Sequence, residues 1–329
     1  MKILVLTDHQ KHSDQNSVYG LVYALRQREP EARFYIASRA VGANSDFFYH
    51  FNSRELQVSE AQNGFQFNEA EKFFAEGAKK MKLEEFDWIL LRLPRPIPTG
   101  FFDFLRTEFS EQHIINRPTG IERTSNKLFL LNYPQWCPPM KHCRSVEDIL
   151  NFAEQFPIVL KPLESYGGQG LIRIEEERVW EEQKTIDRDA FIQRLRRVES
   201  VDYLAMKYLK NVNMGDKRIL VSNENILGAT LRKPPPGSWL CNVSQGGTSH
   251  EVEPDEREIE ILNDLIPDMR SLGVILFGID TLVGDDGLRY LSEINTLSLG
   301  GLTPADRASG KPILDKAAEG IWNFINKKS

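Results

Sequence analysis

Residues 158–174 read IVLKPLESYGGQGLIRI, two short apolar runs on either side of a polar loop. This pattern predicts two buried strands joined by a turn. Lys161 ends the first run, and the loop contains Gly167, Gly168 and Gly170. Glycine lets backbone amides approach a ligand closely, so a cation on a strand end beside these amides can hold a triphosphate without a Walker loop. A glycine-rich hairpin turn that binds nothing is the alternative.

A second group of polar side chains lies at the ends of two later apolar runs. Asp280 ends the run that begins at Val274, whose apolar neighbours do not tolerate a charge without a partner. Glu293 and Asn295 are two residues apart, so on a strand they point to the same face. Carboxylate and amide oxygens suit Mg²⁺, which also keeps waters and substrate phosphates around it. A helix cap and two solvated strand-end residues are the alternative.

Further basic and polar residues lie between these two groups. The sequence Gly-Asp-Lys-Arg218 opens one expected strand, and Arg232 lies at the end of the strand that should pair with it as a hairpin. The segment CNVSQGG (241–247) is polar and contains glycine, as expected of a loop that closes over a site. Each feature is weak evidence alone, but their order along the chain is more specific.

This order resembles the ATP-grasp superfamily, and more closely its prokaryotic-type glutathione synthetases. The resemblance covers about residues 86–300. The stretches that carry it are INRPTGIERTSNKLFLL (115–131), IVLKPLESYGGQGLIRI (158–174), YLKNVNMGDKRILV (208–221), ATLRKPP (229–235), CNVSQGG (241–247) and FGIDTL with YLSEINTLS (277–298).

The resemblance implies an α/β protein whose C-terminal part is α+β. An N-terminal parallel α/β substrate domain (residues 1–120) would come first. An ATP-grasp fold of two antiparallel-sheet subdomains would follow. The small subdomain (121–203) would contain the glycine-rich loop, and the C-terminal subdomain (204–329) would contain the metal and substrate site.

The resemblance also implies roles for individual residues. Lys127 and Lys161 would contact the nucleotide phosphates, the backbone of residues 207–209 would read adenine, and Asp216 would meet the ribose. The full nucleotide site would comprise Lys127, Lys161, Gly167, Gly168, Gly170, Lys207, Tyr208, Leu209, Asp216 and Lys217. The ligands of Mg²⁺ or Mn²⁺ would be Asp280, Glu293 and Asn295.

The implied activity is that of an ATP-dependent carboxylate–amine ligase. A substrate carboxylate attacks the γ-phosphorus of ATP, and an amine then displaces phosphate from the acyl phosphate to form an amide. The catalytic residues would be Arg218 and Arg232, which bind the acyl phosphate or the peptide, and Asn242, which helps to close the site. The particular reaction implied joins γ-glutamylcysteine to glycine. A ligase for another amino acid or peptide, an acyl-phosphate-forming kinase and a non-catalytic ATP-binding module are the alternatives.

Two segments depart from the family pattern. Residues 296–301 (TLSLGG) stand where the family usually has a Val-Thr-Ser-Pro type of sequence, and they would face the acceptor amine. Residues 92–96 (RLPRP) replace a family stretch that contains an acidic residue. The identities of the acceptor amine and the donor acid therefore stay open.

The apolar patterns predict the individual elements. Strand, helix and strand at 3–6, 18–25 and 34–37 are typical of a parallel α/β layer, whereas residues 41–83 receive no assignment. Further expected strands are 88–91, 113–115, 158–161, 171–174, 203–208, 217–221, 226–231, 274–283 and 289–294. Further expected helices are 101–109, one that carries Lys127, Leu128 and Leu131, 145–156, 189–198, 254–272 and, after irregular chain from Pro304, 314–325.

Composition excludes several other classes of protein. The 329 residues include 41 Lys and Arg against 47 Asp and Glu, and a net charge of −6 gives no general attraction to nucleic acid or to an anionic membrane. No P-loop, zinc-binding or serine-hydrolase motif occurs, and His9 and His12 fit a solvated turn. Three scattered cysteines fit a reducing compartment, so we expect a cytoplasmic protein that acts on small-molecule or short-peptide substrates. A homo-oligomer is left open.

Overall fold

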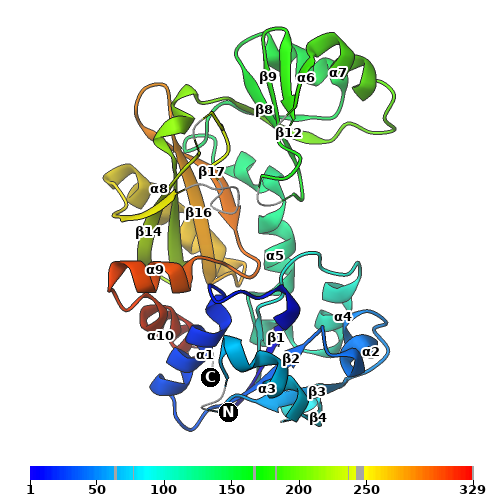
Figure 1. Ribbon diagram of the computed structural model, residues 1–329, viewed down its shortest axis with the longest axis vertical. Coiled ribbons are helices and arrows are strands. Elements are labelled where there is room, and N and C mark those ends of the chain that lie inside the picture. The colour runs from blue at the N-terminus through cyan, green and yellow to red at the C-terminus, as the bar shows by residue number, and fades with distance from the viewer. Residues whose placement is uncertain are drawn as a thin grey trace.

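Three sheets organise the computed structural model, which describes residues 1–62, 65–76, 78–165, 168–181, 184–235, 237–241 and 248–327. The N-terminal sheet (blue to cyan) lies at the bottom of Figure 1, the C-terminal sheet (yellow-green to orange) lies above it, and a third sheet (green) lies at the top. Among the helices of these ranges, none is long and apolar enough to cross a bilayer.

The N-terminal sheet has six strands in the order β4-β3-β2-β1-β5-β6. They are β1 (Lys2–Thr7), β2 (Arg33–Ser38), β3 (Glu55–Glu60), β4 (Ala78–Lys82), β5 (Trp88–Leu91) and β6 (Ile114–Ile115). The strands β2, β1, β5 and β6 pair in parallel, which confirms the expected parallel layer. The unassigned residues 41–83 include the antiparallel strands β3 and β4, of which β4 lies at the edge of the sheet, and the helices α2 (Ser45–Phe48) and α3 (Ala70–Glu76).

Both faces of the N-terminal sheet are covered, which explains why β1 is apolar at consecutive positions. Leu4 and Leu6 pack on one face, in a core that includes residues of α4 (Phe101–Glu108). Ile3 and Val5 pack on the other face against α1 (Ser17–Arg28) and the C-terminal helix α10 (Ile313–Asn326). The helix α10, which lies in the range 204–329 expected for the C-terminal subdomain, therefore completes the core on this face of the N-terminal sheet.

The second sheet is antiparallel and has the order β11-β10-β9-β8-β12-β7. Its strands are β7 (Met140–Cys143), β8 (Ile158–Pro162), β9 (Ile172–Glu175), β10 (Arg178–Glu181), β11 (Lys184–Asp187) and β12 (Tyr203–Lys207). The expected β8–β9 hairpin is confirmed. The helices α6 (Val146–Ala153) and α7 (Arg188–Leu195) share a core with this sheet. The strand β12 extends past residue 203, where we expected the subdomain to end.

The C-terminal sheet is also antiparallel and has the order β15-β14-β13-β16-β17. Its strands are β13 (Asp216–Ser222), β14 (Asn225–Lys233), β15 (Thr248–Val252), β16 (Leu276–Val283) and β17 (Arg289–Asn295). The helix α8 (Glu256–Ser271) packs on one face of the sheet. It begins at a capping box formed by Asp255 and Glu258, one residue beyond the expected start at Pro254.

The expected helix that carries Lys127 is present as a 3-10 helix over residues 127–132, after α5 (Pro118–Ser125). Two other local expectations were wrong. Pro304 lies within α9 (Leu302–Ser309), because a proline in the first helical turn removes an amide that has no partner within the helix. His9 is buried and stacks on Phe74, so its turn is not solvated.

Candidate active site

A cleft lies between the β8/β12 side of the second sheet and the C-terminal sheet. It holds about 880 Å³ of empty space, part of it open to solvent, which is in the range of a small-molecule site. The lining residues include Lys127, Val159, Lys161, Gly168, Leu171, Lys207, Tyr208, Leu209, Asp216, Arg232, Trp239, Asp280, Leu282, Ser292 and Glu293. One part of this lining is apolar and the rest is charged.

Two lysines enter the cleft from different elements. Lys127 begins the 3-10 helix, and its ammonium contacts the Ser165 carbonyl and lies 3.8 Å from Glu293 Oε1. Burial lowers the pKa of Lys127 to about 8 and also lowers the pKa of Lys161. Lys161 Nζ donates to the carbonyl oxygen and to Oγ of Ser292, at 2.9 and 3.0 Å. A polyanion in the cleft would therefore meet two desolvated cations.

Ser292 occupies an irregularity in the pairing of β16 with β17. Asp280 is opposite Glu293 but Thr281 is opposite Leu291, so β17 carries Ser292 as one extra residue. A bulge of this kind redirects side chains locally. Here it brings the Ser292 carbonyl and hydroxyl to Lys161, and this pairing positions the lysine at the cleft.

Four side chains of the C-terminal sheet form a charged network at the same cleft. Asp280 accepts from Arg218 Nε and one terminal nitrogen, both at 2.7 Å, and lies 3.0 Å from Arg232. Arg232 also donates to both carboxylate oxygens of Asp216, at 2.8 and 2.5 Å. Burial opposes ionisation, but the two guanidinium groups hold the pKa of Asp280 below its usual range. Burial and the nearby Asp280 raise the pKa of Asp216 to about 6.

The three expected metal ligands lie on adjacent strands. Asp280 on β16 is opposite Glu293 on β17, and Asn295 Nδ2 lies 3.2 Å from Asp280 Oδ2. The set consists of two carboxylates and an amide, oxygen donors that suit a hard divalent cation when phosphate oxygens complete its shell. Across the described ranges, no cluster of three His, Cys, Asp or Glu side chains suits a metal ion.

The segment after β12 forms the apolar end of the cleft. The N–H groups of Lys207 and Tyr208 donate to the Pro139 and Pro157 carbonyls at 2.8 Å, which fixes this backbone. The guanidinium carbon of Arg173 lies over the Tyr208 ring, 4.0 Å from the centroid of that ring. The ring of Trp239 also lies near Tyr208. Trp239 was not predicted as a site residue, because one aromatic residue in a polar loop has no periodic pattern.

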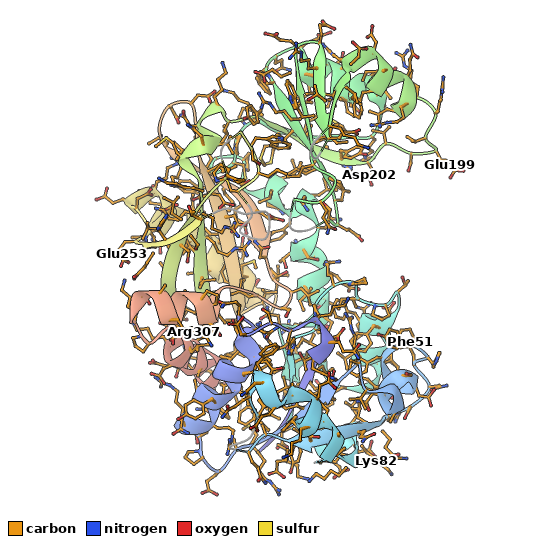
Figure 2. All side chains as sticks on the ribbon, viewed as in Figure 1. Phe51, Lys82, Glu199, Asp202, Glu253 and Arg307 are labelled. Carbon is orange, nitrogen blue, oxygen red and sulfur yellow. The ribbon has the colours of Figure 1, made fainter. Side chains whose placement is uncertain are left out.

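Lys217 lies on the opposite face of the sheet from the cleft. It alternates with Asp216 and Arg218 along β13, and successive side chains of a strand point to opposite faces. Its ammonium contacts the carboxylate of Glu258, which is fully buried, and donates to the Glu253 carbonyl at 3.1 Å. Glu253 lies at the outer edge of the C-terminal sheet (Figure 2). The expected placement of Lys217 at the nucleotide therefore has no support in the geometry. The alternation of side chains along β13 could have indicated this from the sequence.

The structure brings most of the expected site residues to the cleft. Arg218 and Asn295 reach it through their contacts with Asp280. Gly170 has a φ of +69° and packs against Pro162, at the base of the glycine-rich turn. Gly167 and Asn242 lie outside the described residues. Ser165 and Ser292 are contacts that sequence reasoning missed, because a bulge and a loop carbonyl leave no residue pattern.

The fold has close counterparts among solved structures. The crystal structure of D-cycloserine synthetase DcsG superposes with a TM-score of 0.66 over 98% of each chain, at 12% identity. The RimK domain protein ATP-grasp from Sphaerobacter thermophilus DSM 20745 superposes with a TM-score of 0.57, at 13% identity, over 98% of this chain and all of that one. At such identities the likeness establishes the fold alone, which is that of the ATP-grasp proteins.

Sequence comparison defines the family. Residues 126–310 match the family described as prokaryotic glutathione synthetase, ATP-grasp domain. A glutathione synthetase of Parasynechococcus marenigrum (strain WH8102) is 30% identical over 252 residues, which cover 75% of this chain and 78% of that protein. The chain belongs to the prokaryotic glutathione synthetase family, and it is an ATP-grasp carbon–nitrogen ligase.

Proposed function

We propose that this ligase makes glutathione by joining γ-glutamylcysteine to glycine at the expense of ATP. The observation that carries the proposal is the convergence, in one cleft of a chain of this family, of buried Lys127 and Lys161 with the network around Asp280. A nucleotide triphosphate would bring negative charge into a cleft that holds these two buried lysines and two arginines.

The nucleotide phosphates would lie between Lys127 and Lys161, beside Gly168 of the glycine-rich turn. The base would lie on the apolar surface made by Val159 and Leu171. The peptide group of Leu209 would read the base edge, since the N–H groups of Lys207 and Tyr208 are already engaged. Arg173 over Tyr208 would stiffen this end of the cleft.

The metal would be Mg²⁺ or Mn²⁺, held by Asp280, Glu293 and Asn295. When bound, such an ion neutralises charge on phosphate oxygens. Asp280 has a second task that depends only on this chain, because its bonds to Arg218 and Arg232 orient both guanidinium groups toward the cleft. Asp216 orients Arg232 from the other side.

The reaction follows from these placements. The cysteinyl carboxylate of γ-glutamylcysteine attacks the γ-phosphorus, ADP leaves, and the glycine amine then displaces phosphate from the acyl phosphate to form the amide. Arg218 and Arg232 would bind the developing negative charge, so no protein nucleophile is required. Water must be kept from the acyl phosphate. We assign this task to the segment 241–247 with Asn242, which stays a prediction because it lies outside the described residues except for Cys241.

The test is a product assay with an acceptor panel. The protein is incubated with MgATP and γ-glutamylcysteine, with and without glycine, and then with other amino acids, while ADP release and product mass are followed. Glycine-dependent ADP release with a tripeptide product supports the proposal. A product with another amino acid only would replace glycine as the acceptor. ATP binding without turnover for every acceptor would favour a non-catalytic module, and ADP release that needs no amine would favour a kinase.

A further inference from the structure

Arg92 is a buried cation at the carboxyl end of the parallel strands. It directly follows β5, which pairs with β1 on the side opposite β2, and ligands of parallel sheets bind where the strand order reverses in this way. The Arg92 backbone is fixed, since its N–H donates to the Leu6 carbonyl at 2.8 Å and its carbonyl accepts from Thr7 Oγ1 at 3.2 Å. Only 4% of the residue is exposed.

The Arg92 guanidinium has little that balances its charge. One of its terminal nitrogens donates to the Leu299 carbonyl at 2.7 Å, and its buried Nε has no hydrogen-bond partner among the residues that the structure describes. Within the described residues, no carboxylate lies within 4.0 Å of it, and Asp8 on the adjacent strand end is bonded to Arg39 at 2.8 Å. Burial, and then Arg92 itself, lowers the pKa of the neighbouring His12 to about 4, so this histidine is neutral.

The charge nevertheless persists at neutral pH. Burial lowers the pKa of Arg92 only to about 10. An ionised group held out of water without a counter-ion costs stability, and proteins keep such groups where a ligand completes the pair. A carboxylate is the natural complement, because its two oxygens match the guanidinium fork.

The position of Arg92 connects it with the reacting groups. Leu299, which accepts its hydrogen bond, lies in the segment that follows β17 and its expected metal ligands. Two residues later, a Cβ on Gly301 would lie 4.0 Å from Arg218 Cδ. One short segment therefore accepts a hydrogen bond from Arg92 and passes close to the arginine assigned to the acyl phosphate.

We propose that Arg92 binds a substrate carboxylate that does not react. The proposal rests on the proposed function, in which two such groups occur: the α-carboxylate of the glutamyl residue of the donor and the carboxylate of glycine. Arg92 would hold one of them while the cysteinyl carboxylate or the amine reacts near Arg218.

The rival explanation is structural: Arg92 would only stabilise the fold through its hydrogen bond to the Leu299 carbonyl. Unfolding of the protein without substrates separates the two. Arg92→Met should leave the urea midpoint unchanged or raised, because it removes an unpaired buried charge. The matched control is Arg39→Met, also buried, which should lower the midpoint because it leaves Asp8 without its partner. If Arg92→Met lowered the midpoint as much as Arg39→Met does, the structural explanation would be favoured.

Binding of a simple carboxylate gives a readout that needs no turnover. Formate, compared with chloride at equal ionic strength and pH, should raise the melting temperature of the wild type and not that of Arg92→Met. Equal responses of both proteins would overturn the proposal, even if the proposed reaction proves wrong. If the wild type makes no glutathione, the proposed function fails and the formate result still decides the role of Arg92.

Turnover then identifies which substrate Arg92 holds. One arm compares γ-glutamylcysteine with 4-aminobutanoylcysteine, which lacks the glutamyl α-carboxylate, and the other compares glycine with glycinamide. In one of the two arms, the kcat/KM of the wild type should be about 10–150-fold higher for the substrate that has the carboxylate than for the analogue that lacks it. Arg92→Met should lose this preference, Arg92→Lys should keep part of it, and the preference in the other arm should stay. Unchanged preferences in both arms of Arg92→Met would contradict the proposal.

Discussion

Glu293 differs from Asp280 of the candidate site in being more exposed and more weakly paired. Its side chain is 26% exposed, and its ion pair with Lys127 spans 3.8 Å, whereas Asp280 is buried among arginines. A residue placed this way contributes to ligand binding more than to folding. The sequence alone indicated both carboxylates, since each ends an apolar run, but not this difference in environment.

We therefore expect Glu293→Gln to separate activity from stability. The change keeps the shape and removes a charged metal ligand, so turnover should fall by at least about 100-fold while the free energy of unfolding changes by no more than about 0.5 kcal/mol. Steady-state ADP release and urea denaturation measure the two effects. Glu224→Gln, in the exposed β13–β14 turn, is the control and should match the wild type. A Glu293→Gln enzyme with normal turnover would remove Glu293 from the metal site.

For Lys217 we expect the opposite of Glu293, a large effect on stability and a small effect on ligand binding. Its partner Glu258 is fully buried, so Lys217→Met should lower the free energy of unfolding by about 3–5 kcal/mol. Lys311→Met, which breaks exposed pairs with Glu251 and Glu253, should leave the free energy of unfolding close to that of the wild type. Urea denaturation gives both numbers. If Lys217→Met were as stable as the wild type but had a raised KM for ATP, Lys217 would belong to the nucleotide site after all.

At the scale of elements, the start of β13 determines how two site residues meet. Gly215 precedes Asp216 and has φ 91° and ψ 158°, a conformation that is almost exclusive to glycine. A Cβ there would lie 2.6 Å from the Arg232 carbonyl. The close approach of β13 and β14 therefore depends on the missing side chain, and it allows the pairing of Asp216 with Arg232.

Gly215→Ala should consequently damage the site as well as the fold. We expect a loss of about 1–3 kcal/mol from backbone strain, with a further loss from the clash, and a clear fall in kcat. Gly287→Ala is the matched control, because Gly287 also has a positive φ of 84° but a Cβ added there would meet no atom within 4 Å. It should lose stability and keep its turnover. Equal effects of the two changes on kcat would show that the approach of β13 to β14 is not needed for catalysis.

The elements differ in how far sequence could predict them. Strands such as β1, β8 and β16 are continuous apolar runs because they are covered on both sides or packed under helices, so their patterns are strong. The strands β11 (KTID) and β15 (TSHEV) lie at sheet edges and are mostly exposed, so pairing alone stabilises them and their composition predicts nothing. The polar residues at strand ends could be recognised as site residues from the sequence. The bulge at Ser292 could not be predicted, because it depends on the pairing of two strands.

At the scale of the whole molecule, two of the three sheets form one packed body. Asn116, between β6 and α5, donates to the Leu276 and Thr296 carbonyls and accepts from the Ile275 and Leu276 amides, which joins the N-terminal sheet to the C-terminal one. Trp322 of α10 donates to the Leu25 carbonyl of α1. The second sheet has its own core and stands apart at the top of Figure 1. The cleft therefore lies between this sheet and the packed body.

This arrangement also explains how an acidic protein can bind a polyanion. The net charge of −6 is spread over the whole chain, whereas Lys127 and Lys161 are brought together from separate segments by folding. The local electrostatic field in the cleft decides the binding of an anion, and the average composition of the chain does not. Sequence could predict these residues one by one, but their convergence depends on how the second sheet and the C-terminal sheet lie against each other.

The measurement that tests the central claim most directly is the transfer of oxygen from the donor to phosphate. γ-Glutamylcysteine labelled with ¹⁸O in its cysteinyl carboxylate is turned over with MgATP and glycine, and the inorganic phosphate is analysed by mass spectrometry. Ligation through an acyl phosphate predicts one labelled oxygen in each phosphate released. Unlabelled phosphate, formed while the tripeptide accumulates, would contradict the account.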